Sequence, residues 1–380
     1  CFRDEDSRAD RQPEFTQLDV ELSFGDESDV QDLMEELHVE LLADCLGVDV
    51  PRPFPRLTHA EAMRRFGSDK PDLRFGLELV DLSAVLAGTG AAVLAGALAD
   101  GGSVVAIAVP AAAGTLSRKD LDGWADWARA RGAGGLAWAV VEPGEAGPTL
   151  RSPLAKFLTD EEVAGVVAAC GASEGDTILM AAGPTAASRE LMGALRVALA
   201  GALGLVPADE WRFLWVVEPP MFDPETDRTG RPTGGWTPNH HPFTAPAPEW
   251  EDRFEQDPGA ATARGYDLVL NGIELGSGSI RIHDAEVQRR VFRFLGIGDE
   301  EAEEKFGFLL RGLAHGVPPH GGIATGLDRT VMLLAGEDTI RDVIAFPKTQ
   351  SGACPLTDAP APYDAAALAE LGLRLAPEQG

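Results

Sequence analysis

The chain has 380 residues, of which 44% are hydrophobic and 24% are charged, and this composition excludes collagen-like, disordered and coiled-coil classes. The length predicts about two or three domains. Lys and Arg number 32 against 61 Asp and Glu, and the resulting net charge of −29 disfavours tight, non-specific binding to nucleic acid or to an anionic membrane. Residue 1 is Cys and no signal-like stretch follows it, so we expect the chain to begin inside a longer protein.

The spacing of the cysteines and the hydropathy of the chain exclude further classes of protein. The four cysteines lie far apart and form no C-x-x-C pair, which argues against a disulfide framework or a zinc site and favours a cytoplasmic location. The longest uncharged run, residues 83–99, is slightly shorter than the ~20 apolar residues that a spanning helix needs. We therefore interpret it as small-residue packing or a strand pair, and expect no membrane span.

Composition divides the chain into three stretches, residues 1–75, 76–207 and 208–380. In the first, residues 15–24 alternate strictly between two faces, the pattern of a half-buried strand. Ser28 and Gln31 have the spacing of a capping box, and apolar residues then recur at helical spacing as far as Gly47. This predicts an amphipathic helix that ends at that glycine.

The middle stretch predicts a self-contained α+β module. Strand-like runs cover residues 91–98, 104–109, 136–141 and 177–182. Helices are predicted to start at Ser117 and after a capping box at Thr159 and Glu162, and a third, striped by leucines, ends near Gly204.

The third stretch contains Asn271-Gly272 between two apolar-alternating runs, which is the strongest short signal for a β-hairpin. Residues 286–295 and 300–313 then predict helices, and residues 323–334 a strand that passes directly into a helix.

Two clusters near the N-terminus carry chemistry. Arg3 lies in an acidic loop, where its planar fork is suited to a phosphate or a carboxylate; the alternative is a solvated charged turn. The polar face of the following strand carries Phe15, Gln17, Asp19 and Glu21. An aromatic ring beside amide and carboxylate groups is suited to stacking a base and holding an ammonium, although an ordinary exposed face has the same composition.

Two further clusters lie in the third stretch. Asp267 and Glu274 flank the hairpin turn, and two carboxylates on adjoining strands can share Mg²⁺, which bridges substrate phosphates; Arg281 follows as a bidentate carboxylate partner. An edge hairpin with an incidental ion pair is the alternative. In residues 323–334 a predicted strand is followed by a glycine and then by a helix that carries Arg329 in its first turn. Such a helix start is a natural anion site. His240-His241 has no third ligand at zinc spacing.

In this order the clusters resemble one family, bacterial-type aspartyl-tRNA synthetase, a class II aminoacyl-tRNA synthetase. CFRDEDSRADRQPEFTQLDVELSF resembles its motif 2 and GGIATGLDRTVMLL its motif 3, and HHPFTAP, YDLVLNGIELGSGSIRIH and FPKTQSGACPLTDAPAP match further signatures. The resemblance covers the whole chain. It implies an α+β fold in which a class II antiparallel sheet with flanking helices, from residues 1–75 and 208–380, is interrupted by an inserted α+β GAD-like domain, residues 76–207.

The resemblance implies an aspartate–tRNA ligase that activates L-aspartate with ATP and Mg²⁺ and transfers it to tRNA(Asp). Arg3 and Arg329 would be catalytic, and Asp267 and Glu274 would hold the metal. The ATP site would comprise Arg3, Asp4, Glu5, Gln12, Phe15, Glu274, Gly326, Leu327, Asp328 and Arg329. The aspartate site would comprise Arg3, Gln17, Asp19, His240, His241 and Arg281. The full-length protein would be a homodimer.

Several alternatives stay open. One is an enzyme that charges both tRNA(Asp) and tRNA(Asn). Anticodon discrimination would lie largely in the anticodon-binding domain, which is expected before Cys1 together with motif 1 and the flipping loop. A catalytically silent module that serves as a binding or dimerisation partner is a second hypothesis. A third is an amide-forming paralogue, although such short paralogues are not expected to carry the insertion. The chain departs from the family pattern at Ser277, where a glycine is expected, and at Thr325, where a larger residue is common.

Overall fold

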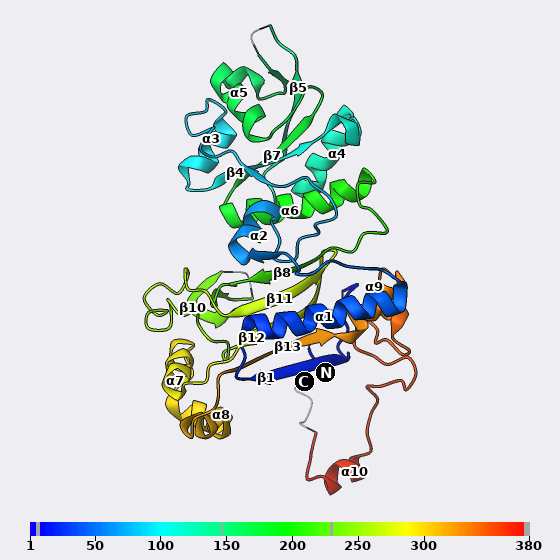
Figure 1. The fold of residues 1–380 in the computed structure, drawn as a ribbon, viewed down its shortest axis with the longest axis vertical. Coiled ribbons are helices and arrows are strands. Elements are labelled where there is room, and N and C mark those ends of the chain that lie inside the picture. Colours follow the sequence, from blue (N-terminus) through cyan, green and yellow to red (C-terminus); the bar gives the residue numbers. More distant parts are fainter. Residues whose placement is uncertain (5–7, 146, 229–230, 376–380) are drawn as a thin grey trace. The chain divides into compact units, whose positions relative to one another are not determined.

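The computed structural model describes residues 1–4, 8–145, 147–228 and 231–375. The chain divides into two compact units. The first comprises the described residues of Cys1–Val20, His38–Asp49 and Ala324–Gly380, and the second those of Glu21–Leu37 and Val50–Ile323. Strands and helices are both abundant (Figure 1), so the fold is α+β as predicted.

The larger sheet has six strands in the order β1-β13-β12-β11-β8-β2. Within the second unit β11 runs antiparallel to both β12 and β8, and β2 pairs in parallel with β8. The indole of Trp215 on β8 meets the ring of Tyr266 on β11 edge-on, with ring centroids 6.0 Å apart. The strands are β1 Gln17–Ser23, β2 Arg56–Thr58, β8 Phe213–Val217, β11 Gly265–Leu270, β12 Ile273–Ile280 and β13 His320–Gly326.

The predicted hairpin is confirmed as β11 and β12. Asn271 and Gly272 have φ of 53° and 84°, the left-handed conformation that a two-residue turn requires at both positions. A register shift between Leu268 and Val269 marks a bulge, so the two strands carry Asp267 and Glu274 on either side of an irregular stretch.

Helix α1 spans Glu27–Leu46 and ends at Gly47, which has φ of 67°. The predicted capping box at Ser28 and Gln31 is wrong by two residues. The Asp26 carboxylate accepts hydrogen bonds from Ser28 N at 2.8 Å and Asp29 N at 3.3 Å, and Asp29 Oδ2 accepts from Asp26 N at 2.8 Å. Aspartate caps as well as serine does, and the sequence spacing could not rank the two.

Strand β1 is present where predicted, and its apolar face is covered only in part. Val20 and Leu22 are half-buried while Asp19, Glu21 and Ser23 on the opposite face are exposed. Leu18 and Phe24, also expected on the apolar face, are 45% and 84% exposed. Alternation therefore predicted the strand and the half-burial of its middle but not the exposure at either side, because alternation indicates which side chains share a face and not what covers that face.

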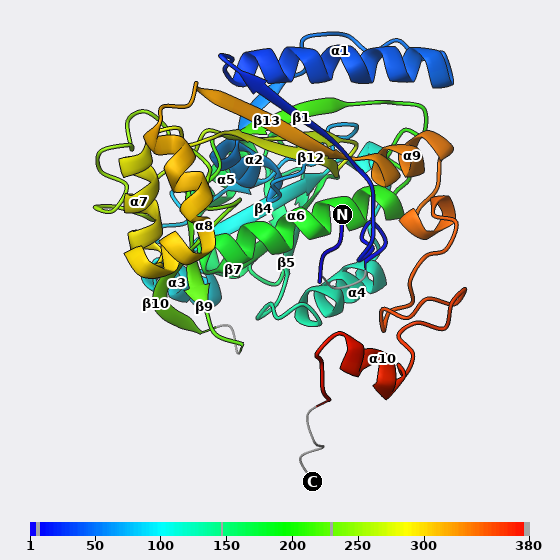
Figure 2. The same cartoon turned by 90° about the horizontal axis from the view of Figure 1, so that it is seen from below.

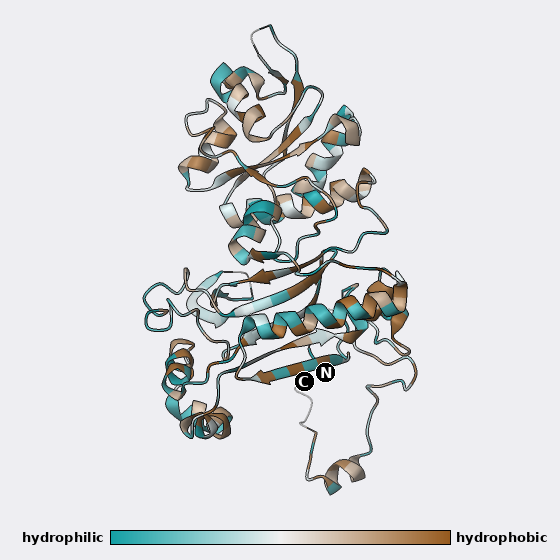
Figure 3. Cartoon of the chain, in the orientation of Figure 1, coloured by the Kyte–Doolittle hydropathy of each residue, from teal (hydrophilic) through white to brown (hydrophobic). Residues whose placement is uncertain are grey.

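A second, five-stranded sheet has the order β3-β4-β7-β5-β6 and is antiparallel throughout. Its central strands are strongly hydrophobic (Figure 3). The helix start predicted at Ser117 and the capping box predicted at Thr159 and Glu162 are confirmed, and Ser117 also forms a capping box, with Asp120. The elements are β3 Val80–Asp81, β4 Ser103–Val109, β5 Ala137–Glu142, β6 Thr149–Arg151, β7 Thr177–Gly183, α3 Ala92–Ala99, α4 Arg118–Arg129, α5 Asp160–Ala169 and α6 Thr185–Ala202.

The strand predicted for residues 91–98 is wrong, because these residues form helix α3. The run consists of Ala, Gly, Val and Leu, and a short, uniformly apolar stretch has no periodicity that separates helix from strand. Leu94 is buried against the sheet core, and tertiary packing therefore decided the conformation.

The remaining elements complete the second unit and the C-terminal part of the first. Helices α7 and α8 lie side by side (Figure 2), and Phe292 stacks on Phe306 between them with ring centroids 4.9 Å apart. These elements are α2 His59–Phe66, β9 Phe222–Thr226, β10 Pro232–Pro238, α7 Ala285–Phe294, α8 Asp299–Ala314, α9 Leu327–Ala335 and α10 Ala365–Glu370.

Candidate functional site

The N-terminal loop folds back on itself and brings Arg3 to Phe15. Arg3 N donates to Pro13 O at 2.9 Å and Phe15 N donates to Cys1 O at 3.1 Å. The Arg3 guanidinium then lies 5.3 Å from the centroid of the Phe15 ring, within the range of a cation–π contact. The loop thus joins a cation to an aromatic surface, as the predicted ATP site requires. Asp4 is exposed, and Glu5 lies outside the described residues.

The start of helix α9 is fastened to the same N-terminal segment within the first unit. Asp328 Oδ2 accepts a hydrogen bond from Thr16 N at 2.7 Å, and Leu327 N donates to Thr16 O at 2.9 Å. Arg329 Nε donates to Asp10 O at 3.0 Å. Gly326 is the residue that precedes the helix. The structure therefore brings the two predicted ATP-binding segments together.

Gln12 and Gln17 are held differently. Gln12 is buried, and its Oε1 accepts from Lys348 N at 2.8 Å, while its Nε2 has no partner among the described residues. Gln17 Oε1 accepts from Cys1 Sγ at 3.0 Å. Asp19, two residues further along β1, is exposed. An orphaned buried amide costs free energy unless a ligand or water pairs with it.

The predicted metal pair faces one edge of the hairpin in the second unit. Burial first, and then the nearby Glu274 carboxylate, raise the pKa of Asp267 to about 8, while a hydrogen bond from Ser277 opposes the shift. Asp267 Oδ1 has no partner among the described residues. Two crowded carboxylates with an unpaired buried oxygen fit a hard divalent cation, which would relieve both the burial and the repulsion.

Arg281, at the end of β12, is at the centre of a polar network. Its Nε and Nη2 donate to the two carboxylate oxygens of Glu21, both at 3.2 Å. Its Nη1 lies 2.5 Å from His241 Nε2 and donates to Ser279 Oγ at 2.8 Å. The fork of Arg281 thus already holds a carboxylate in the bidentate geometry that arginine favours.

Both adjacent histidines are kept neutral. Burial, followed by the positive charge of Arg281 and by His240, lowers the pKa of His241 to about 4. Burial also lowers the pKa of His240, whose Nδ1 lies 2.9 Å from Ser277 Oγ. A neutral ring has one acceptor nitrogen, so His241 accepts either from Phe243 N at Nδ1, 3.2 Å away, or from the Arg281 guanidinium at Nε2, according to its tautomer.

A family model described as "tRNA synthetases class II (D, K and N)" matches residues 1–350. The chain belongs to this family. Similar relatives are the aspartate–tRNA(Asp/Asn) ligases of Salinispora tropica, Thermobifida fusca and Mycobacterium tuberculosis, which are 55%, 54% and 52% identical to it. All three alignments cover 100% of this chain but only 62 to 63% of each relative. The antiparallel-rich sheet and flanking helices are consistent with a class II synthetase domain.

In this class II synthetase chain, three site neighbours were missed by the sequence analysis as site residues. Glu21 pairs with Arg281, Ser277 contacts both His240 and Asp267, and Lys348 bonds Gln12 through its backbone and Glu14 through Nζ at 3.0 Å. Glu21 was visible on the polar face of the strand, at the same alternation as Asp19. The alternation of residues thus indicated that Glu21 lies on the polar face, but nothing in the sequence indicated that Arg281 is its partner.

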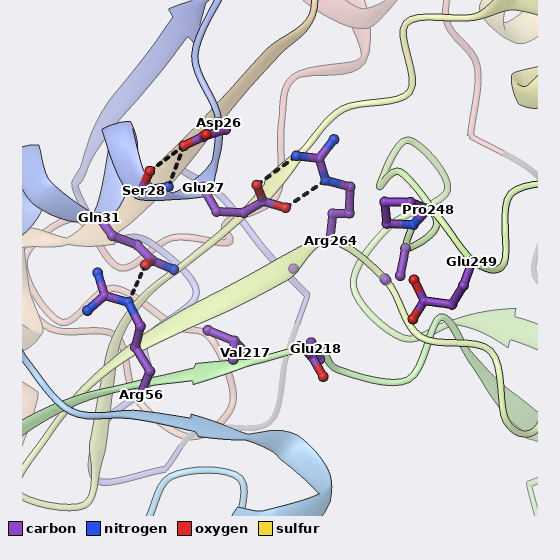
Figure 4. A pocket seen from close by; sticks show the side chains of 13 residues that line it. Asp26, Glu27, Ser28, Gln31, Arg56, Val217, Glu218, Pro248, Glu249 and Arg264 are labelled. Atoms are coloured by element: carbon purple, nitrogen blue, oxygen red, sulfur yellow. Dashed lines mark hydrogen bonds and ion pairs between the residues drawn. The ribbon is translucent and has the colours of Figure 1, made fainter.

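A cavity of about 380 Å³ in the second unit is not the predicted site (Figure 4). Its walls carry two internally satisfied pairs: Arg264 donates to both oxygens of Glu27 at 2.6 and 2.7 Å, and Arg56 Nε donates to Gln31 Oε1 at 2.8 Å. Glu218 and Pro248 complete the rim shown in Figure 4. None of the predicted site residues lines it.

The described parts of the chain contain neither a ready-made metal cluster nor a membrane span. Among those residues no group of three His, Cys, Asp or Glu side chains has metal-binding geometry. The described helices also include none that is long and apolar enough to cross a membrane.

Proposed function

We propose that this chain is the catalytic part of an aspartate–tRNA ligase, which activates L-aspartate with ATP and transfers it to tRNA. The observation that carries the proposal is the Arg281 fork, held by Glu21, His241 and Ser279 in a chain of the D, K and N family. An arginine that pairs with one carboxylate in a partly buried setting is suited to recognise another, namely the side chain of aspartate.

In the proposed reaction, an oxygen of the aspartate α-carboxylate attacks the α-phosphorus of ATP, the bond to the β-phosphate oxygen breaks, and pyrophosphate leaves. A ribose hydroxyl at the end of tRNA then attacks the carbonyl carbon of the aspartyl-adenylate, loses its proton, and AMP leaves. Catalysis of this kind rests on positioning and charge stabilisation. We assign Arg3 to the α-carboxylate and α-phosphate, and Arg329 to the terminal phosphate.

The other assignments follow the resemblance of these segments to the family. Phe15, already in contact with the Arg3 guanidinium, supplies a face for the adenine, with Gln12 and the start of α9 around the nucleotide. Gln17 and Asp19 hold the substrate ammonium. Asp267 and Glu274 would hold Mg²⁺, which supplies charge neutralisation on the phosphates when bound.

Arg281 explains the choice of aspartate over asparagine. The neutral amide of asparagine lacks the negative charge that a guanidinium pairs with, and it offers the fork one oxygen in place of the two of a carboxylate, so its binding is disfavoured. We infer dual specificity for tRNA(Asp) and tRNA(Asn) from the names of the relatives. Homodimer formation and a cytoplasmic location are part of the same proposal.

Aspartate-dependent ATP–pyrophosphate exchange, measured on this chain within its full gene product, tests the activity. We expect exchange with L-aspartate and none with L-asparagine, and a large loss of kcat/KM for aspartate in Arg281→Lys, whose compact ammonium cannot form the fork. Absence of exchange in the unmodified protein would refute the proposal. Charging assays with purified tRNA(Asp) and tRNA(Asn) test the inferred dual tRNA specificity. Charging of tRNA(Asp) alone would show that the enzyme is specific for tRNA(Asp).

A further inference from the structure

Arg196, on helix α6, is a buried cation far in sequence from every residue assigned above. Its side chain is 1% exposed. Its Nε donates to Gly76 O at 2.9 Å, and its Nη2 donates to Asp72 O at 2.9 Å and Phe75 O at 2.6 Å. A buried charge is costly unless it is fully hydrogen-bonded. The three carbonyl oxygens can accept these hydrogen bonds from Arg196 at the same time only if residues 72–76 keep one conformation.

Aromatic rings reinforce this clamp. The Arg196 guanidinium lies 4.1 Å from the centroid of the Phe75 ring and 5.0 Å from that of Phe66. Helix α6 also approaches Gly67 backbone to backbone, since a Cβ added at Gly67 would lie 2.0 Å from Arg189 O. The segment from Phe66 to Gly76 is therefore fixed to α6 at two points.

The clamped segment packs on the turn of the hairpin that carries the metal carboxylates. Asp72 is 6% exposed and is held by a bidentate pair with Arg74, the shortest distance being 2.7 Å. A Cβ added at Gly272 would lie 3.2 Å from Asp72 Cβ and 3.8 Å from Asp72 Cα and N, so Asp72 lies close against this turn residue. A shift of residue 72 toward the turn would therefore displace the turn between β11 and β12.

Two charged residues just before the clamped segment act on Asp267 through their charges. Asp69 raises and Lys70 lowers the pKa of Asp267, after the larger effects of burial, Glu274 and Ser277. The packing at the turn and these charged groups come from one stretch of chain, which α6 holds.

We propose that Arg196 is a positioning residue for the Asp267–Glu274 hairpin, so that helix α6 of the stretch 76–207 forms part of the scaffold of the metal site. The clamp fixes residues 72–76, these fix the hairpin turn, and the turn sets the separation of the two carboxylates. The proposal rests on the proposed function in assigning these carboxylates to Mg²⁺.

The test compares Arg196→Lys and Arg196→Met with Arg189→Lys in the full gene product. Lysine keeps the charge but lacks the planar fork that meets three carbonyls, and it protects the test if the methionine variant does not fold. Arg189 lies on the same helix and pairs with Asp81 at 3.6 Å, so it controls for loss of an arginine from α6.

The first readout is amide hydrogen exchange. We expect faster exchange in residues 266–277 for both Arg196 variants and no change there for Arg189→Lys. The second is the Mg²⁺ concentration for half-maximal ATP–pyrophosphate exchange, which should rise on the order of tenfold, as when outer-shell partners of metal ligands are removed. The KM for aspartate should stay unchanged.

Faster exchange confined to α6 and residues 66–76, with an unchanged Mg²⁺ requirement, would overturn the proposal and leave Arg196 a local structural residue. If the unmodified protein shows no pyrophosphate exchange, the proposed function fails, and the hydrogen-exchange comparison still decides whether Arg196 positions the hairpin.

Discussion

Replacement of Asp267 by Asn offers the sharpest test of the crowded carboxylate pair. Burial and Glu274 raise the pKa of Asp267 from 3.8 to about 8. Between pH 3.8 and about pH 8, Asp267 keeps its proton in the folded chain and has lost it in the unfolded chain. The free energy of unfolding of the metal-free protein therefore falls as the pH rises through this range. At about 1.4 kcal/mol for each pH unit, the loss is at most about 4 kcal/mol between about pH 5 and about pH 8.

Thermal and urea unfolding in EDTA, followed by tryptophan fluorescence across this pH range, would measure the effect. We expect Asp267→Asn to have the flatter profile, because the amide does not titrate. Excess MgCl₂ should stabilise the unmodified protein at the alkaline end and leave the variant unchanged.

Asp284 provides a matched control, since it caps α7 through hydrogen bonds from the Val287 and Glu286 amides, which lower its pKa. Its contribution is present above its unfolded pKa and is lost only in more acidic solution. Asp284→Asn should therefore keep the slope of the unmodified protein. Parallel profiles for the unmodified protein and Asp267→Asn would refute the reasoning.

Three further predictions concern the second unit. Glu21→Gln should raise the KM for aspartate about ten- to a hundredfold without changing that for ATP, because Arg281 loses the charge-assisted partner that orients its fork, worth roughly 1.5–3 kcal/mol; equal effects on both substrates in pyrophosphate exchange would contradict this. Gln288→Leu, which removes the donor to the carbonyl after His241, should cost about 1–2 kcal/mol in thermal unfolding and raise the same KM, and an unchanged KM would remove this residue from the site. Gly278→Ala should lower the free energy of unfolding by roughly 1–3 kcal/mol, since the added Cβ would lie 2.4 Å from the Tyr266 ring. Gly312→Ala, in open space within α8, is the control and should raise it by up to about 1 kcal/mol. Similar melting temperatures for the two variants would disprove the steric argument.

Local signals in the sequence were sufficient where the chemistry itself is local. The turn at Asn271-Gly272 needs two residues that tolerate positive φ, and the caps at Ser117 and Thr159 need a side-chain oxygen within three residues of the amides that they bind. Local reasoning failed for residues 91–98, where a uniform apolar composition suits a strand and a helix equally, and for Asp26, which competed with Ser28 for the same cap.

The site shows the same division. The order of the clusters and their residue types were sufficient to predict the family, and Arg281, singled out as a bidentate carboxylate partner, does hold a carboxylate in that geometry. The sequence did not reveal that Glu21 is the carboxylate held by Arg281 in this structure, 260 residues away. It also did not reveal that Arg196 holds the carbonyls of residues 72–76, more than 100 residues distant. Such pairs depend on strand register and helix packing, which place distant segments within hydrogen-bond distance, and only the tertiary structure decides them.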